Sequence, residues 1–388
     1  MAEPLRNHFD DRVPRTIARQ LVAAWPAFPV DAFIADALDG YDALGLMDRG
    51  RHIARALRRH LPAAYEDALA ILLRSVGPRP TKTEGDGGMA SFLYLPHVHF
   101  VAEFGLDDFA PSMRALHLLT QRFTAEFSIR PFLERHERAT LSLLRDWAAD
   151  PDAHVRRLVS EGTRPRLPWA ARLRRFQADP APVVALLELL KDDPEPFVRR
   201  SVANNLNDIG RDHPAVLIEV ARRWLSDAGD ERRALVRHAL RSLVKQGHPA
   251  ALALLGFGAQ AAVIVEDVRI APPRPTKGER VTIEFNVRGT GPSSQQVLVD
   301  LRVHFMKGNG ATSPKVFKVK AVELAPGDTA RCRKTVSLAD LTTRRHHAGA
   351  HRVEALLNGR VEPLGTFLLE ERAASTASSA AITAAVRS

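Results

Sequence analysis

Residues 150–159 read D-P-D-A-H-V-R-R-L-V, and residues 193–202 read D-P-E-P-F-V-R-R-S-V. Six of the ten positions are identical, and the two segments start 43 positions apart. A turn that leads into a helix and recurs at this spacing is typical of HEAT repeats, whose helical units stack into a solenoid. A weaker third copy, L-V-R-H-A-L, lies at residues 235–240. The pattern predicts inward-packed valines and stacked arginines in a basic stripe, which suits a nucleic-acid backbone.

The sequence changes character near residue 262. Apolar and polar residues alternate in V-T-I-E-F-N-V at 281–287 and in V-L-V-D-L-R-V-H-F at 297–305, as in half-buried β-strands. The last residues are rich in Ala, Ser and Thr. We therefore predict a multidomain protein with these parts: an all-α HEAT-like repeat solenoid (1–258), a linker (259–265), a small all-β immunoglobulin-like sandwich (266–372) and a mobile tail (373–388).

The basic charge is distributed unevenly along the 388 residues. Residues 1–150 hold 18 Lys/Arg and 20 Asp/Glu, whereas residues 151–262 hold 18 and 13, and residues 263–388 hold 19 and 12. The whole formal excess of +10 therefore follows residue 150, which favours a polyanionic partner for the repeats and the C-terminal region. An arginine-rich composition inherited from a high-GC genome is the competing explanation.

The single cysteine, Cys332, excludes a disulfide framework and a thiolate metal site. The N-terminus has no apolar signal region, and the uncharged stretch over 249–265 is short for a membrane span. We expect a cytoplasmic bacterial protein that is associated with the nucleoid when it is bound to DNA, without contact with membranes.

Acidic residues accompany the repeat arginines at helical spacing. Glu161 lies four positions after Arg157, and Asp208 lies eight positions after Arg200, so each acid shares a helix face with an arginine. The ordinary interpretation of such an acid is a structural ion pair, and the frequency of such pairs on protein surfaces favours it. An acid beside phosphate-binding arginines gains a function if a positive charge develops there during a reaction.

The stretch S-E-G-T-R-P-R-L-P-W at 160–169 follows the first repeat helix. It predicts a loop that carries Arg164 and Arg166, and Pro168 is suited to the first turn of the next helix. Trp169 is then expected near the N-terminus of that helix. It is either a core residue or an aromatic platform for a nucleotide, and taken alone the core position is favoured.

Three segments together resemble a known family. They are residues 160–169, V-R-R-S-V-A-N-N-L-N-D-I-G-R-D-H-P at 198–214, and A-E-F-S-I-R-P-F-L at 125–133. They are similar to segments of the AlkC class of alkylpurine DNA glycosylases, HEAT-like repeat proteins related to the AlkD class. The resemblance covers roughly residues 1–258, and some members of the family carry a C-terminal immunoglobulin-like domain.

The resemblance implies a monofunctional DNA glycosylase of base excision repair. It implies removal of cationic N3-alkylated bases, chiefly 3-methyladenine and 3-methylcytosine, from duplex DNA without base flipping. The matched positions imply an active-site set of Glu126, Glu161, Trp169 and Asp208. Only the resemblance points to Glu126, because its periodicity indicates no more than a helix residue near Arg130. We expect a monomer that needs no cofactor, no metal and no nucleotide.

These residue types fit the chemistry of the implied reaction. An N3-alkylated base is already cationic and leaves as a neutral molecule, so no general acid is required. The remaining barrier is the positive charge that grows on the deoxyribose, as in oxocarbenium-like sugar chemistry. Our hypothesis is that Asp208 and Glu161 stabilise this charge and position water while Glu126 assists. Trp169 would lie against the sugar or the cationic nucleotide.

Two groups of basic residues are the expected DNA contacts. In the repeats, the candidates for phosphate contacts are Arg157, Arg164, Arg166 and Arg200. In the β-rich region, Lys307, Arg344 and Arg345 are candidates by charge and loop position alone. With these residues the β-domain would hold the opposite side of a bent duplex.

The main alternative is a non-catalytic HEAT-repeat scaffold that binds DNA or protein, because fold alone proves no activity. A metal enzyme has little support, since the histidine pairs at 97/99 and 346/347 have no nearby Cys or acidic residue at ligand spacing. A phosphate-cradling G-x-x-x-x-G-K-[ST] motif is absent from the sequence, as is a Ser–His or Cys–His nucleophile set.

Overall fold

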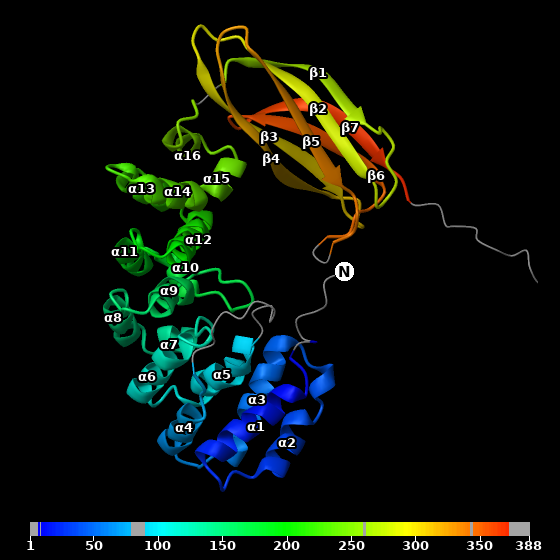
Figure 1. The fold of residues 1–388 in the computed structure, drawn as a ribbon. Helices are drawn as coiled ribbons and strands as arrows, with labels where there is room; N and C mark the ends of the chain where they lie inside the picture. The colour runs from blue at the N-terminus through cyan, green and yellow to red at the C-terminus, as the bar shows by residue number, and fades with distance from the viewer. Residues whose placement is uncertain (1–6, 8, 79–89, 259–260, 342–343, 372–388) are drawn as a thin grey trace, which may run out of the picture. The chain divides into compact units, whose positions relative to one another are not determined.

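The computed structural model describes residues 7, 9–78, 90–258, 261–341 and 344–371. The chain divides into two compact units, one that ends at Ala239 and one that begins at Leu240 (Figure 1). The predicted mobile tail over 373–388 lies outside the described residues. In the described part of the chain, no helix is long and apolar enough to cross a membrane.

In the described residues of the first unit, helices are the regular secondary structure, joined by turns and loops. Its α-helices and short 3₁₀ helices (η) are α1 (Arg12–Ala24), α2 (Val30–Leu38), η2 (Tyr41–Ala43), α3 (Leu46–His60), α4 (Tyr65–Arg74), η3 (Ala90–Tyr94), α5 (Leu95–Phe104), α6 (Phe109–Thr120), α7 (Arg130–Arg135), α8 (Glu137–Trp147), α9 (Ala153–Gly162), α10 (Arg174–Ala178), α11 (Ala181–Leu190), α12 (Pro196–Asp212), α13 (Pro214–Leu225) and α14 (Asp230–Ala239).

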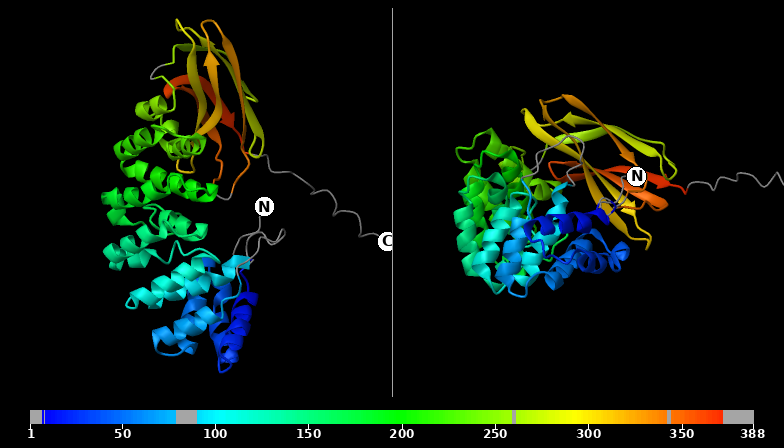
Figure 2. Two further views of the ribbon diagram at one scale, coloured as in Figure 1. Left: turned by 60° about the vertical axis from the view of Figure 1, so that its left-hand side comes forward. Right: turned by 60° about the horizontal axis from the view of Figure 1, so that its bottom comes forward.

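The repeat helices stack in two layers, which confirms the predicted HEAT-like solenoid. Helices α9, α12 and α14 pack in succession in one layer, while α8, α11 and α13 form the other (Figures 1 and 2). Val155, Leu158 and Val159 of α9 are buried, as their i, i+3, i+4 spacing predicts. The apolar spacing therefore decides which face of each repeat helix packs against its neighbours.

The first arginine of each V-R-R segment holds its own D-P turn. Arg156 donates to the carbonyls of Asp150 and Pro151, and Arg199 donates to the carbonyls at the same two positions of the second copy. Arg156 also reaches the next repeat, where its Nε lies 2.6 Å from one carboxylate oxygen of Asp193 and its Nη2 lies 3.1 Å from the other. The first arginine of each segment therefore has a structural role within the repeats.

In the residues of the second unit that the structure describes, two short helices are joined to seven strands. These are α15 (Arg241–Lys245), α16 (Pro249–Leu254), β1 (Val263–Ala271), β2 (Arg280–Gly289), β3 (Gln295–Met306), β4 (Thr312–Leu324), β5 (Thr329–Ser337), β6 (Gly349–Leu357) and β7 (Arg360–Leu369). The strands form a three-stranded sheet in the order β1-β2-β5 and a four-stranded sheet in the order β4-β3-β6-β7, and each pairing within them is antiparallel. This arrangement confirms the predicted immunoglobulin-like sandwich.

Alternating residues of the two sheets make the core of the sandwich. On β2, Val281, Ile283 and Phe285 are buried, as the alternation in the sequence predicts. Strand β1 already begins at Val263, inside the predicted linker over 259–265. Gly247, after α15, approaches Gly359 so closely that a Cβ atom on Gly247 would lie 2.8 Å from the Gly359 Cα. This close backbone contact explains why α15 belongs with the strands.

Candidate active site

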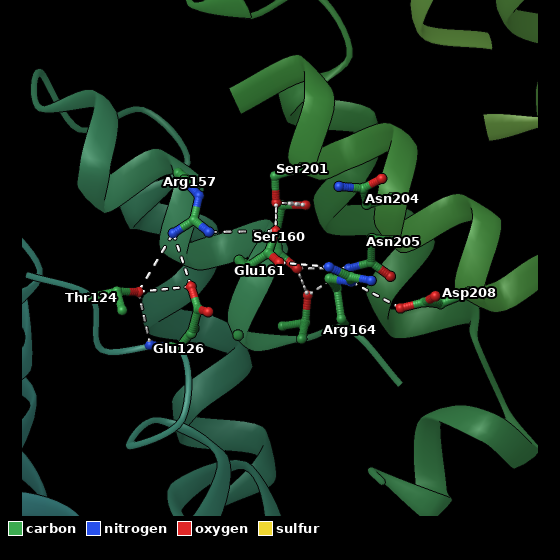
Figure 3. A network of polar contacts seen from close by, with 12 residues as sticks. Thr124, Glu126, Arg157, Ser160, Glu161, Arg164, Ser201, Asn204, Asn205 and Asp208 are labelled. Atoms are coloured by element: carbon green, nitrogen blue, oxygen red, sulfur yellow. Dashed lines mark hydrogen bonds and ion pairs between the residues drawn. The ribbon is translucent and has the colours of Figure 1, made fainter. Parts of the chain in front are cut away.

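Three of the four expected active-site residues line one pocket of the first unit. Glu126, Glu161 and Trp169 surround a volume of about 400 Å³, together with apolar side chains that include Phe92 and Phe123. The fourth residue, Asp208, is joined to this pocket through an arginine that it shares with Glu161 (Figure 3). Segments far apart in the sequence thus bring the acids together.

Glu161 is held by contacts to both of its carboxylate oxygens. Its Oε1 accepts a hydrogen bond of 2.6 Å from Arg164, and its Oε2 accepts one of 2.6 Å from the hydroxyl of Ser201. Only 6% of Glu161 is exposed, so it does not lie on a solvated helix face. An acid fixed in this way keeps its orientation without reorganisation when charge develops beside it.

Asp208 lies on α12 and is 3% exposed. Its Oδ2 accepts a hydrogen bond of 2.8 Å from Arg164 Nε, so one guanidinium bridges Asp208 and Glu161. Burial raises the pKa of Asp208 above the ordinary value of 3.8, although Arg164 acts in the opposite direction. The ion pair expected for these acids is therefore present, but it lies in the interior and not on the surface.

Glu126 lies in a turn that precedes α7, so the helical position inferred from its periodicity is wrong. The first residue of α7 is Arg130, four positions later. The Oε2 atom of Glu126 accepts hydrogen bonds from Arg157 at 2.9 Å and from the Thr124 hydroxyl at 2.7 Å. The contact with Thr124 is local and the one with Arg157 comes from α9, and the periodicity of the sequence reports neither.

Trp169 lies neither in the core nor at the start of a helix. It is 69% exposed, and α10 begins only at Arg174. Hydrogen bonds from Ala170 N to Leu167 O and from Leu173 N to Pro165 O keep the chain in a loop beyond Pro168. The indole is consequently available to a ligand at the rim of the pocket.

The arginines expected at the DNA differ in their availability. Arg157 is partly exposed and bridges Glu126 to Glu161, whose Oε2 lies 3.9 Å from its Nη2. Arg164 is 8% exposed and engaged with two acids, which argues against its predicted phosphate contact. Arg166 forms a bidentate pair with Asp212, whereas Arg200 is exposed on α12. The second arginine of each V-R-R segment thus faces outward at least in part.

The basic candidates of the second unit lie on two adjacent loops. Lys307 is exposed in the turn between β3 and β4, and Arg345 is exposed after β5. The guanidinium of Arg344 lies over the ring of Phe305, 4.7 Å from its centroid. A Cβ atom placed on Gly308 would lie only 3.2 Å from the His347 ring, so the two loops lie close together.

Sequence reasoning missed the polar side chains that support the acids. Ser201, Asn205 and Asp208 follow one another at i, i+4 and i+7 and are buried on the same face of α12. Asn205 donates to the carbonyl of Ser160 at 2.7 Å and to the hydroxyl of Thr163 at 3.1 Å. This polar stripe inside an otherwise apolar helix face was a readable signal in the sequence.

Comparison with known proteins gives consistent matches over both units. Residues 123–246 match the family model of the DNA alkylation repair enzymes, and residues 264–371 match the C-terminal Ig-like domain of the uncharacterised protein YhaZ. The YhaZ protein of Bacillus subtilis (strain 168) is 32% identical over 92% of this chain and 97% of its own length. The solved structure of Pseudomonas fluorescens alkylpurine DNA glycosylase AlkC, bound to DNA containing an abasic site analog, is 37% identical, covers 96% of this chain and 100% of that chain, and has a TM-score of 0.87.

Proposed function

The chain belongs to the AlkC family of alkylpurine DNA glycosylases, and from this premise we propose that it excises cationic N3-alkylated bases from duplex DNA. The enzyme is a DNA glycosylase for alkylation damage. We assign 3-methyladenine and 3-methylcytosine as its substrates, and we assign it a monomeric state.

The reaction breaks the bond between C1′ of the deoxyribose and the base nitrogen. The base leaves as a neutral molecule, and its positive charge passes to the sugar. A water molecule then adds to C1′ and gives its proton to a carboxylate or to solvent. Glu161 and Asp208 stabilise the cationic sugar, and Glu126 assists in orienting the water. Trp169 lies against the sugar and adds about 1–2 kcal/mol of attraction for the cation.

One observation carries this proposal. Glu126 and Glu161 line the same pocket as an exposed tryptophan, and Glu161 shares its arginine with the buried Asp208. The three acids share Arg157 and Arg164, so their negative charge exceeds the positive charge of the arginines that bridge them. This excess opposes the binding of a polyanion, and a function in the reaction accounts for its presence. Stabilisation of a transient cation supplies such a function, and burial strengthens it because the local dielectric is low.

The isosteric amides test the assignment of the acids. We expect Glu161→Gln and Asp208→Asn each to lower the single-turnover excision of 3-methyladenine by about 100-fold or more. Affinity for the same DNA should stay equal or rise, because a negative charge is removed near the phosphates. Glu188→Gln is the matched control, since Glu188 lies on α11, in the other helix layer, and pairs with Lys191 just after this helix and with Arg223 on α13. Full activity in both site variants would falsify the assignment.

The absence of base flipping is a separate part of the proposal and rests on the family resemblance. The alternative is that the damaged base enters the pocket of about 400 Å³ beside Trp169. A 2-aminopurine placed next to a non-cleavable lesion analogue distinguishes the two. If the damaged base stays in the base stack, we expect only a small change in the fluorescence of 2-aminopurine. A large increase that disappears when Phe123→Trp narrows the pocket would instead indicate entry of the base.

A further inference from the structure

The segment from Thr163 to Leu173 connects α9 to α10 and carries the exposed Trp169. Its internal main-chain hydrogen bonds are long, at 3.3 Å from Ala170 N to Leu167 O and 3.2 Å from Leu173 N to Pro165 O. Trp169 nevertheless has a φ of 65°, a left-handed conformation that bulky residues rarely adopt. Such a conformation persists only where the surroundings hold it in place.

Arg130, the first residue of α7, supplies this support. Its Nη1 donates to the carbonyls of Gly162 at 3.1 Å and Arg164 at 2.8 Å, and its Nη2 donates to the carbonyl of Ala171 at 2.5 Å. The first two acceptors lie before Trp169 and the third lies after it. One guanidinium therefore ties both ends of the segment together, and the fixed, planar arrangement of its donors suits three carbonyls at separate positions better than the compact ammonium of a lysine.

The position of Arg130 is interior and close to the acids. It is 5% exposed, and burial lowers the pKa of its guanidinium to about 10, so it stays protonated at neutral pH. Arg130 and Trp169 both line a second pocket, of about 420 Å³. The buried cation thus lies against the same loop that presents Trp169 to the site.

We propose that Arg130 is a positioning residue for base excision. It contacts no reacting atom and acts through the carbonyls at 162, 164 and 171, which set the indole of Trp169 against the sugar. This inference rests on the proposed function only in the part that Trp169 takes in the reaction.

Arg130→Lys tests the proposal, because it keeps the positive charge and removes the planar guanidinium group. We expect single-turnover excision of 3-methyladenine at saturating enzyme to fall by about 10-fold to 100-fold, as for a displaced reacting group. Affinity for the DNA should stay within about twofold, because no phosphate contact is removed. Arg135→Lys is the matched control, since Arg135 lies on the same helix, is exposed and pairs with Asp107.

A double-mutant cycle separates positioning from a general loss of structure. If Arg130 acts through Trp169, the variants Trp169→Ala and Trp169→Ala with Arg130→Lys should excise at the same rate. Equal effects of Arg130→Lys in both backgrounds would overturn the proposal.

Should Arg130→Lys fail to fold, Arg130→Ala with added guanidinium ions replaces it. Recovery of excision with guanidinium but not with ammonium would support the proposal, and no recovery would contradict it.

Fluorescence gives a readout that does not depend on activity. Trp169 is 69% exposed, whereas Trp147 and Trp224 are buried, so the difference between each protein and its Trp169→Ala partner isolates Trp169. We expect Arg130→Lys to change the acrylamide quenching of this difference signal, and unchanged quenching would count against the proposal. If Trp169→Ala alone is fully active, the proposed role of Trp169 fails, while the quenching result still decides whether Arg130 holds the loop.

Discussion

At the scale of single residues, Arg164 shows how one side chain can serve two acids. It donates to Glu161 Oε1 at 2.6 Å and to Asp208 Oδ2 at 2.8 Å, and it is almost completely buried. Burial opposes its charge, yet the two carboxylates raise its pKa above the ordinary value for arginine. The three groups therefore form one charged unit, and removing the guanidinium takes away the cation that Glu161 and Asp208 share.

The pH dependence of excision should report this unit. Burial raises the pKa of Asp208 and Arg164 lowers it, with a net value above the ordinary 3.8. Because only the ionised acid stabilises a cation, the rate of excision should decline as the pH falls. The decline should begin at a higher pH than the titration range of an exposed aspartate. Arg164→Met should move this acid limb to higher pH, whereas Arg166→Met, which frees Asp212, should not. Superimposable pH profiles for Arg164→Met and the parent enzyme would contradict the prediction.

Single residues also show how far the sequence could be interpreted. Spacings of four and eight residues, respectively, identified Glu161 and Asp208 as acids that accompany the repeat arginines. It did not predict their burial, because Arg164 and Asp208 are 44 positions apart and meet only once α9 and α12 stack. The exposure of Trp169 was not predictable either, since it depends on a left-handed backbone that Arg130 supports from another helix.

At the scale of elements, the repeat sequence predicted the stacking but not the way it is fastened. Asp193 opens the second D-P turn, accepts a hydrogen bond from Glu195 N and receives two from Arg156 of the preceding repeat. Its side chain is 2% exposed. Asp193 therefore has two functions, because it holds the turn that precedes α12 and joins this turn to the preceding repeat.

Asp193→Asn should consequently destabilise the helical unit by about 3 kcal/mol, because it leaves Arg156 without its buried partner. Asp192→Asn is an unusually close control. Asp192 is the adjacent residue and also forms a bidentate pair, with Arg232, but its side chain is 50% exposed. We expect it to cost less than about 1 kcal/mol. Thermal unfolding followed by far-ultraviolet circular dichroism compares the two, and equal losses would show that burial of Asp193 is not the deciding factor.

At the scale of the whole molecule, the charge is divided along the boundary between the two units. Residues 1–239 hold 34 Lys/Arg and 33 Asp/Glu, whereas residues 240–388 hold 21 and 12. The unit that carries the acids is thus nearly neutral, at +1, and the second unit carries the remaining +9. The excess of positive charge therefore lies in a different part of the chain from the candidate catalytic acids.

This division predicts that the second unit contributes much of the affinity for DNA and little of the chemistry. A fragment of residues 1–239 should bind undamaged duplex DNA more weakly than the full chain, with a shallower dependence on salt because fewer counterions are released. Once saturated with enzyme, DNA containing 3-methyladenine should lose its base at a rate close to that of the full chain, since the four candidate residues remain. Replacing Lys307, Arg344 and Arg345 by glutamine in the full chain should reproduce part of the loss in affinity. A fragment with undiminished affinity and an unchanged salt slope would instead place the phosphate contacts on the helical unit, where Arg157 and Arg200 are exposed in part or in full.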